Sequence, residues 1–248
     1  MSEAHVVLVD ISTFIFRSFH AAQGEFATAD AVSIFRRLLQ RLLQELRKSN
    51  PPTHLAAVFD APGPTFRNAI YPDYKAHRSP GPDSLIPQLP LLHAVVQECG
   101  LPRVEQAGFE ADDLIASYAR QARARGATVT IVASDKDLMQ LVTDKVTMFD
   151  PTKGRRIGRT EVIEKFGVPP EKVVEVQALA GDSTDNVPGV PSIGVKTAAQ
   201  LIVEYGDLET LLARIAESEQ SKVRQALLDN AEQAGFRAGW CSSMTRSH

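Results

Sequence analysis

Acidic side chains occur at five separate places in this sequence, each at the end of an apolar run or at the start of an expected helix. Carboxylates that meet in one crevice repel one another unless cations lie between them. Oxygen ligands of this kind suit hard divalent ions such as Mg²⁺ and Mn²⁺. We therefore interpret the following residues as candidate metal ligands: Asp10, Asp60, Glu110, Asp112, Asp113, Asp135, Asp137, Asp182 and Asp185.

Helix capping is the simplest alternative explanation for any one of these clusters. Asp and Glu are common caps and first-turn residues, and Glu110, Asp112 and Asp113 would suit the start of an amphipathic helix without any metal. Capping alone does not readily explain five such placements in one chain. We therefore favour the metal site.

The apolar pattern predicts an α/β fold that brings these acids together. Residues 6–9 and 55–59 read as buried strands, and apolar residues recur at helical spacing between Val32 and Leu46. A helix over 111–125, a strand over 128–133, a short helix after Lys136 and a strand over 145–149 continue the alternation. This order predicts a mostly parallel sheet with helices on both faces. The carboxyl ends of parallel strands share one edge, so the acids should share one pocket.

Residues 61–90 interrupt this regular pattern. The segment combines basic and aromatic residues with prolines that cannot lie within one continuous helix: Pro62, Pro64, Pro72, Pro80, Pro82, Pro87 and Pro90. Long irregular insertions in compact domains are usually functional or mobile. We expect a flexible basic arch or lid.

After Pro151 the sequence predicts helices near 160–166, 171–179, 196–205 and 208–215. The connection over 187–194 has glycines at Gly189 and Gly194 and leads into a helix that carries Lys196 and Thr197. This is a helix-hairpin-helix pattern, in which backbone N–H groups at a helix start bind a phosphate oxygen. An ordinary hairpin of two helices, which needs glycine at positive φ, remains the alternative.

Composition narrows the class of protein. With 248 residues and 44% hydrophobic content, the chain is long enough for one sizeable core and a small module. Cys99 and Cys241 form no paired motif, so a disulfide framework and a structural zinc site are not expected. The apolar run at 6–9 is too short for a signal peptide or membrane span, so we expect a cytoplasmic protein without a membrane partner. The net charge of −3 argues against a generally basic nucleic-acid coat and leaves room for local basic patches.

Taken in order, six motifs of the chain carry a resemblance to a known family. They are Asp10, Phe59-Asp60, Glu110-Ala111-Asp112-Asp113, Ser134-Asp135-Lys136-Asp137, Gly181-Asp182-Ser183-Thr184-Asp185-Asn186 and Pro188-Gly189-Val190. With them the sequence resembles the 5′-nuclease family of flap endonucleases and 5′→3′ exonucleases, above all the N-terminal exonuclease domain of bacterial DNA polymerase I and its free-standing relatives. The resemblance runs from about Val6 to about Asn230.

The resemblance implies a PIN-like core under a helical arch, with a helix-hairpin-helix module that grips duplex DNA. It implies a core over 1–168 with the arch at about 61–90, the module over 169–234 and an atypical tail over 235–248. The nine acids would hold two Mg²⁺ ions, for which Mn²⁺ can substitute, and K⁺ is a candidate ion at the hairpin turn. Asp10, Asp60, Glu110, Asp112 and Asp113 would serve mainly the first ion, and Asp135, Asp137, Asp182 and Asp185 the second.

The resemblance also implies roles for residues near the reacting phosphate. Lys75 and Arg78 would act there beside Asp112 and Asp113. The implied DNA contacts are Arg17, Arg67, Tyr74, Gly189, Val190, Ile193, Gly194, Lys196 and Thr197. For Arg17 and Arg67 a solvated surface position is an equal alternative, as is packing within the arch for Tyr74.

Three positions depart from the family pattern. Ile11 follows Asp10 where glycine is common, and its bulk would alter the approach of substrate to the first metal. Ser192 replaces a frequent glycine in the hairpin, which weakens the expectation of phosphate capture there. The tail over 235–248 does not follow the expected closing segment.

We thus expect metal-dependent hydrolysis of DNA by a 5′→3′ exonuclease and flap endonuclease. The expected substrates are 5′ flaps, branched or nicked duplex and RNA–DNA primers, and a DNA polymerase is the expected protein partner. A noncatalytic module that binds branched DNA is one alternative. A PIN-like ribonuclease is another.

Overall fold

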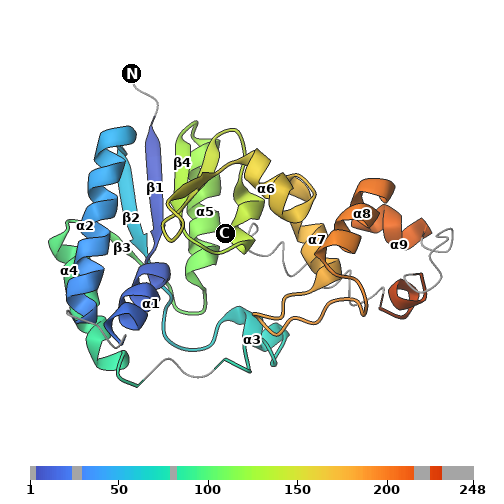
Figure 1. Cartoon of the computed structure of the whole chain (residues 1–248), viewed down its shortest axis with the longest axis horizontal. Helices are drawn as coiled ribbons and strands as arrows, with labels where there is room; N and C mark the ends of the chain where they lie inside the picture. The colour runs from blue at the N-terminus through green and yellow to red at the C-terminus, as the bar shows by residue number, and fades with distance from the viewer. Residues whose placement is uncertain (1–3, 24–29, 79–82, 215–223, 231–248) are drawn as a thin grey trace.

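A mixed sheet forms the centre of the molecule (Figure 1). The computed structural model describes residues 4–23, 30–78, 83–214 and 224–230. In these residues the sheet has the strand order β3-β2-β1-β4-β5-β6, with β1 to β5 parallel to their neighbours and β6 antiparallel to β5. The strands are β1 (His5–Asp10), β2 (His54–Val58), β3 (Arg103–Val104), β4 (Thr128–Val132), β5 (Val146–Asp150) and β6 (Arg155–Ile157). The expected mostly parallel sheet is confirmed.

Helices cover both faces of this sheet because successive strand residues point to opposite sides. Val7 and Val9 of β1 pack with α1 (Ile11–Ala22), α2 (Ala31–Ser49) and α4 (Leu89–Glu98). Leu8 between them packs on the other side, in the core that contains α5 (Ala111–Ala124). Figure 1 shows α2 and α4 on one side of the strands and α5 on the other. The predicted helix between the first two strands is α2, whose apolar residues face the core.

The expected arch segment contains only short helices in its described part, α3 (Phe66–Ile70) and η1 (Ile86–Gln88). Residues 71–78 lie as turns against the loop over 184–186. The N–H of Lys75 donates to the carbonyl of Asp185 at 2.9 Å, and the Asn186 side chain donates to the carbonyl of Asp73 at 2.8 Å. These bonds tie the first half of the segment to the C-terminal part of the chain. Pro80 and Pro82 lie outside the described residues.

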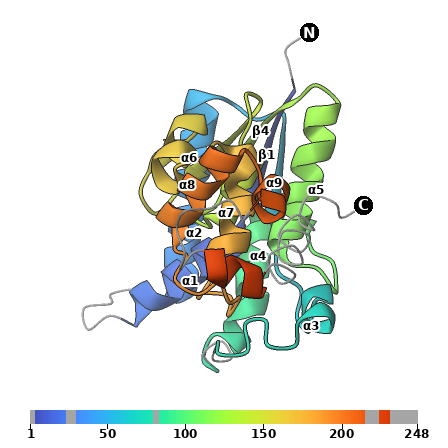
Figure 2. The same ribbon diagram turned by 90° about the vertical axis from the view of Figure 1, so that its right-hand side faces the viewer.

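The chain after β6 is helical, as the sequence predicts, and these helices face the viewer in Figure 2. The elements are α6 (Arg159–Phe166), η3 (Pro170–Lys172), α7 (Val173–Ala180), α8 (Val195–Tyr205) and α9 (Leu208–Arg214). The short helix expected after Lys136 is η2 (Asp137–Leu141), which lies before β5. Their buried side chains belong to the same apolar cluster as those of α5, so this part packs directly against the sheet layer. The predicted atypical tail over 235–248 lies outside the described residues.

The connection from α7 to α8 needs glycine for close backbone approach. A Cβ added to Gly189 would lie 2.1 Å from the carbonyl oxygen of Ala180, and one added to Gly181 would lie 2.2 Å from the nitrogen of Gly189. Positive φ occurs in this connection at Gly181, at 72°, and also at Ser192, at 65°. Serine at the expected glycine position therefore keeps the left-handed backbone, at the cost of local strain.

Candidate metal and nucleic-acid site

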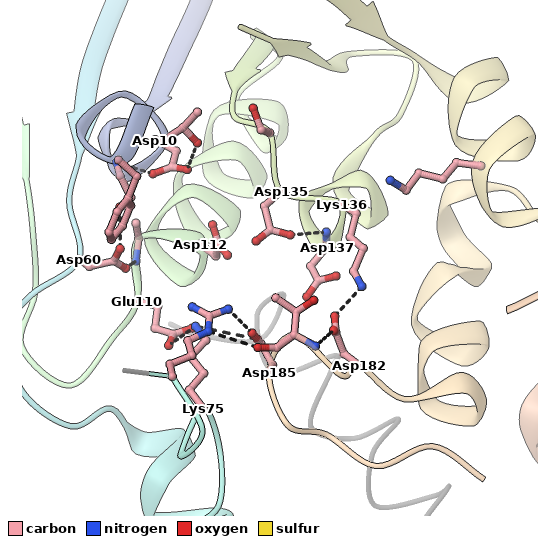
Figure 3. A pocket seen from close by; sticks show the side chains of 18 residues that line it. Asp10, Asp60, Lys75, Glu110, Asp112, Asp135, Lys136, Asp137, Asp182 and Asp185 are labelled. Carbon is pink, nitrogen blue, oxygen red and sulfur yellow. Dashed lines mark hydrogen bonds and ion pairs between the residues drawn. The ribbon is translucent and has the colours of Figure 1, made fainter. Parts of the chain in front are cut away.

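All of the predicted metal ligands except Asp113 line one cavity of about 470 Å³ (Figure 3). The cavity lies at the carboxyl ends of the parallel strands, where β1, β2 and β4 deliver their acids and the loop after α7 adds two more. In Figure 3, Asp112 projects from α5 between the Asp10 and Asp60 pair and Asp135. Residues that are up to 175 positions apart, 185 minus 10, therefore meet in one place.

The first two acids also fix the elements that carry them. Asp10 caps α1, because its Oδ1 accepts the N–H of Ser12 at 2.9 Å and its Oδ2 accepts the Thr13 hydroxyl at 2.8 Å. Asp60 accepts the N–H of Ala111, the first residue of α5, at 2.8 Å, and the hydroxyl of Ser12 at 2.6 Å. The capping alternative thus describes part of what these side chains do, and the same bonds aim them at a common cavity.

The acids on the other side of the cavity are held by turns. Asp135 follows β4, and its Oδ1 accepts the N–H of Asp137 at 2.8 Å. Asp182 forms an antiparallel bridge with Val187, which closes the loop that carries Asp185. Lys136 points back across this edge and its Nζ lies 2.7 Å from Oδ2 of Asp182.

Mutual repulsion is strongest at Asp112. Its carboxylate forms no hydrogen bond or ion pair with any described residue. Burial raises the pKa of Asp112 well above its ordinary value, and the charges of Asp135, Asp10 and Asp60 raise it further. Burial likewise raises the pKa of Asp10 to about 6 and that of Asp137 to about 7, with Asp60 adding to the first shift and Asp135 to the second. The cavity is a place where positive charge would be stabilised.

The donor set fits hard divalent cations. Among the described residues that line the cavity, every acidic group is a carboxylate and none carries a thiol or an imidazole. Among the described residues, no three such side chains are already grouped tightly enough to hold one ion. Binding would therefore draw the carboxylates inward, and the unbonded Asp112 has the fewest contacts to give up.

Asp113 is a correction to the predicted ligand set. Its side chain is fully buried, and Arg67 donates to both of its oxygens, at 2.6 and 2.7 Å. The same carboxylate accepts the N–H of Glu110 at 3.0 Å. These partners leave Asp113 turned away from the cavity that Asp112 enters.

Arg67 and Tyr74 are corrected as well, because both are buried and so are not surface contacts for DNA. The Arg67 guanidinium stacks on the Phe66 ring at 4.6 Å beside the pair with Asp113. Tyr74 packs within the arch segment, the alternative that the sequence left open. Its hydroxyl donates to Glu110 at 2.9 Å and also lies 3.1 Å from Asp185.

Lys75 and Arg78 reach the mouth of the cavity, as expected. The Nζ of Lys75 lies 2.7 Å from Glu110, and Arg78 pairs with Asp185 at 2.5 Å. Lys75 has φ of 55°, a left-handed conformation that is costly for a side chain of this kind. Strain of this sort clusters at functional sites, where the surrounding structure maintains it.

The predicted hairpin contacts divide into two groups. Val190 and Ile193 are buried, and their N–H groups donate to the carbonyls of Leu179 and Val190, so they anchor the turn and do not face a ligand. Gly194 and Lys196 are exposed at the start of α8. Gly194 caps this helix without a side-chain bond, and a Cβ there would meet nothing within 4 Å. The space in front of α8 is open to a ligand.

Two further expectations concern the first helix. Ile11 is fully buried in the core that α1, α2 and α4 share, and it does not line the cavity. The prediction that its bulk alters the approach of substrate is therefore wrong. Arg17 is exposed and donates to the carbonyl of Pro151 at 2.8 Å. Its contact with DNA stays a prediction.

Several cavity residues escaped the sequence analysis. They are Ser12, Thr13, Phe16 and Lys165, while Lys136 and Thr184 were named only as members of motifs, without a role. Ser12, Thr13 and Phe16 follow Asp10 within the first turns of one helix, a local signal that could have found them. Lys165 comes from α6 and has no such signal, because only the fold brings it to the cavity.

We expect the protein without metal to lose stability as pH rises from 5.5 to 8. The folded-state pKa values of Asp10 and Asp137 lie above the ordinary aspartate value, so the folded protein binds more protons than the unfolded chain in this window. One pKa unit corresponds to about 1.4 kcal/mol, and with allowance for coupling between the acids we expect a loss of roughly 2 kcal/mol. Urea unfolding in EDTA at several pH values measures it.

Asp137→Asn supplies the control for this experiment. The variant should show a flatter dependence of the unfolding free energy on pH. Stability that rises with pH between 5.5 and 8 in EDTA would contradict the repulsion described for the cavity.

A parallel sheet whose strand ends converge on a carboxylate cavity, joined to an exposed helix start, is typical of nucleases that use divalent cations. Family models agree with this class. Residues 5–167 match the 5'-3' exonuclease N-terminal resolvase-like domain, and residues 168–238 match the 5'-3' exonuclease C-terminal SAM fold. The chain belongs to the 5'-3' exonuclease family, and the predicted family is confirmed.

Individual relatives agree with this assignment. DNA polymerase I of Rhizobium leguminosarum is 53% identical over 238 residues, which are 93% of this chain and 23% of that protein. A 5'-3' exonuclease of Aquifex aeolicus is 39% identical over 209 residues, 83% of this chain and 71% of that one. The chain spans about a quarter of the length of the polymerase relatives it matches.

Solved structures share the fold. A structure of T5 5'-exonuclease with bound divalent metal ions (zinc) superposes with a TM-score of 0.82 at 24% identity, and the match covers 97% of this chain and 90% of that one. The catalytic core of Rad2 in complex with a DNA substrate superposes with a TM-score of 0.58 at 16% identity, over 92% and 72%. In the parts of our chain that the structure describes, no helix is long and apolar enough to cross a membrane.

Proposed function

We propose that this chain is a divalent-metal-dependent 5′→3′ exonuclease and 5′-flap endonuclease that hydrolyses phosphodiester bonds in DNA. The observation that supports this most is the convergence of carboxylates from five separate segments on one cavity, with Lys75 and Arg78 at its mouth. Such an arrangement suits a reaction in which negative charge accumulates on an already anionic phosphate.

We assign the metal ligands as the sequence suggested, without Asp113. Asp10, Asp60, Glu110 and Asp112 would hold one ion, and Asp135, Asp137, Asp182 and Asp185 the other. Two bound Mg²⁺ ions, or Mn²⁺ in their place, supply the Lewis-acid charge that activates water and stabilises the leaving oxygen. Ser12 and Thr13 fix the orientation of the Asp10 and Asp60 carboxylates through the bonds described above.

Lys75 and Arg78 would change partners when substrate enters. Each now neutralises a carboxylate of the cavity, Glu110 or Asp185. Because Glu110 and Asp185 would also help to hold the ions, Lys75 and Arg78 would be free to contact the scissile phosphate, where a preorganised positive charge contributes on the order of 3 kcal/mol to transition-state stability. The Tyr74 hydroxyl lies between the two ion pairs, because it is within hydrogen-bond distance of both Glu110 and Asp185.

The exposed start of α8 would hold the duplex away from the cavity. Gly194, Lys196 and Thr197 offer backbone N–H groups and a cation to a phosphate, and K⁺ is a candidate ion at this turn. Contacts of this kind carry no base information, so the structure of the DNA, not its sequence, would select the substrate. The division into a core over 1–168 and a DNA-binding module over 169–234 is part of this proposal.

The cellular setting is proposed on the same basis. The polymerase relatives suggest that this activity removes 5′ flaps or RNA–DNA primers beside a DNA polymerase, in the cytoplasm, during DNA replication and repair. Branched and nicked duplex DNA are the substrates that such a role implies.

A cleavage assay on a 5′-flap DNA that carries a 5′ label tests the proposal. We expect short labelled products with Mg²⁺ and none with EDTA. Binding of the flap without any product across a range of Mg²⁺ and Mn²⁺ concentrations would favour the noncatalytic module. An RNA flap cut faster than the matched DNA flap would favour the PIN-like ribonuclease.

A further inference from the structure

Three exposed cations lie beside the carboxylate cavity without a role in the proposed catalysis. We call Lys153, Arg155 and Lys165 the basic patch. They come from the β5–β6 connection, from β6 and from α6. Lys165 lines the cavity itself.

The charges of the basic patch are poorly neutralised by the protein. In the part of the chain that the structure describes, neither Arg155 nor Lys165 forms a side-chain hydrogen bond or ion pair. Lys153 lies 3.8 Å from Asp150, a carboxylate that already accepts bonds from Thr152. By contrast Arg159, also on α6, is paired in fork geometry with Glu171, at 2.7 and 2.9 Å.

The cations of the basic patch repel one another, and this repulsion affects the pKa of Lys165. Partial desolvation lowers the pKa of Lys165, and the nearby charges of Lys153, Lys136 and Arg155 lower it further, while Asp135 opposes them. Lys136 is paired with Asp182 at 2.7 Å, whereas among the described residues Arg155 and Lys165 have no such acidic partner. Cations that repel one another are stabilised by a polyanion that passes between them.

The groove next to Lys165 leads to the start of α8. This groove, of about 530 Å³, lies between the end of α6 and one face of α8 from its first to its last turn, and Lys165 and Lys196 line it together with Glu164 and Glu204. Because Lys165 lines both the carboxylate cavity and this groove, it lies between the cavity and α8, whose first turn carries Lys196.

We propose that the basic patch binds the sugar–phosphate backbone of duplex DNA, on the strand that runs from the carboxylate cavity to the start of α8. This inference rests on the proposed function and adds binding residues to it. Lys165 occupies the central position, and Lys153 and Arg155 contact phosphates at the outer side. The basic patch reads no sequence, because its contacts are to phosphate.

Salt dependence of DNA binding tests the basic patch directly. Each phosphate contact contributes about −0.9 to the slope of log Kobs against log salt for duplex DNA. With a 5′-flap duplex in Ca²⁺, measured by fluorescence anisotropy, Lys165→Ala should weaken binding by roughly 3- to 10-fold and make the slope less negative by about 1. Joint replacement of Lys153, Arg155 and Lys165 by alanine should change the slope by about 2 to 3.

Arg159→Ala is the matched control, since it removes an exposed cation of the same helix that is already paired. It should leave both the affinity and the slope unchanged. All variants should unfold at the wild-type temperature. If Lys165→Ala and Arg159→Ala give the same slope as wild type, the proposal is overturned.

Neutral methylphosphonate groups placed one at a time along the duplex locate the contact. At one position the substitution should weaken wild-type binding and add nothing to Lys165→Ala. Additive losses at every position would contradict the proposal. If wild type binds and cleaves the flap and the basic patch variants behave like wild type, only the binding role of the basic patch is refuted. If wild type neither binds nor cleaves the flap, the proposed function itself is refuted.

Discussion

Asp112→Asn should lower flap cleavage by at least about 1000-fold, which corresponds to roughly 4 kcal/mol of transition-state stabilisation, and should raise the stability of the protein in EDTA. The two effects have one cause. Among the residues that the structure describes, Asp112 makes no hydrogen bond or ion pair, and it is repelled by Asp135, Asp10 and Asp60. In the proposed function its charge binds cations, and its removal relieves the repulsion.

Single-turnover cleavage with Mg²⁺ and thermal unfolding with EDTA measure these opposite changes. DNA binding in Ca²⁺ should stay within a few-fold of wild type, on the order of 3, because phosphate contacts elsewhere dominate affinity. Asp144→Asn is the control, as Asp144 is an exposed acid that does not line the cavity. Retained cleavage in Asp112→Asn, or a lower unfolding temperature in EDTA, would refute the role given to this residue.

The buried pair of Arg67 and Asp113 should show strong energetic coupling. Either Arg67→Met or Asp113→Leu alone leaves a buried charge without its partner, which costs about 3 to 5 kcal/mol of unfolding free energy. In the double variant two apolar side chains replace the pair, and the loss should be smaller than the sum of the single losses by at least about 2 kcal/mol. Urea unfolding of the four proteins gives the coupling energy.

The same double variant tests whether Asp113 is a ligand. Mn²⁺ titration by calorimetry should give the wild-type stoichiometry, because Asp113 is turned away from the cavity. Cleavage should fall through misplacement of Glu110, whose N–H now bonds to Asp113. A lost metal site in the double variant, with Glu110 unchanged in a crystal structure, would return Asp113 to the ligand set.

Neighbours in sequence explain why the acids that line the cavity could be predicted only in part. Asp112 and Asp113 follow one another on a helix, so their side chains diverge by about 100° around its axis. One faces the cavity and the other faces α3. The sequence places acids at the end of a strand or the start of a helix, but the direction of each side chain depends on which partner is buried behind it. Arg67 is that partner, 46 residues earlier.

Periodicity predicted most of the long elements, but it missed the helices α1 and α4 and the two shortest strands. The strands β1, β2, β4 and β5 and the helices α2 and α5 were all expected near their observed bounds. The two-residue β3 and three-residue β6 are too short to carry a pattern. The sheet edge at β6 then went unpredicted, and with it the approach of Arg155 and Lys165 to the cavity.

Glycine in the hairpin shows the same limit. The sequence located the turn, but the reason for Gly189 is the close approach of Ala180, a tertiary contact. Val190 and Ile193 were expected to contact DNA because they belong to the motif. They are buried because the turn must be anchored in the core before α8 can present its open end.

The binding of divalent ions by the carboxylate cavity is the claim on which the whole account depends. A crystal of the protein soaked in Mn²⁺, with anomalous diffraction measured near the manganese edge, tests it most directly. We predict two anomalous peaks in the cavity, one beside Asp10 and Asp112 and the other beside Asp137 and Asp182. Peaks only at other places on the surface, with the cavity carboxylates unmoved, would contradict the account.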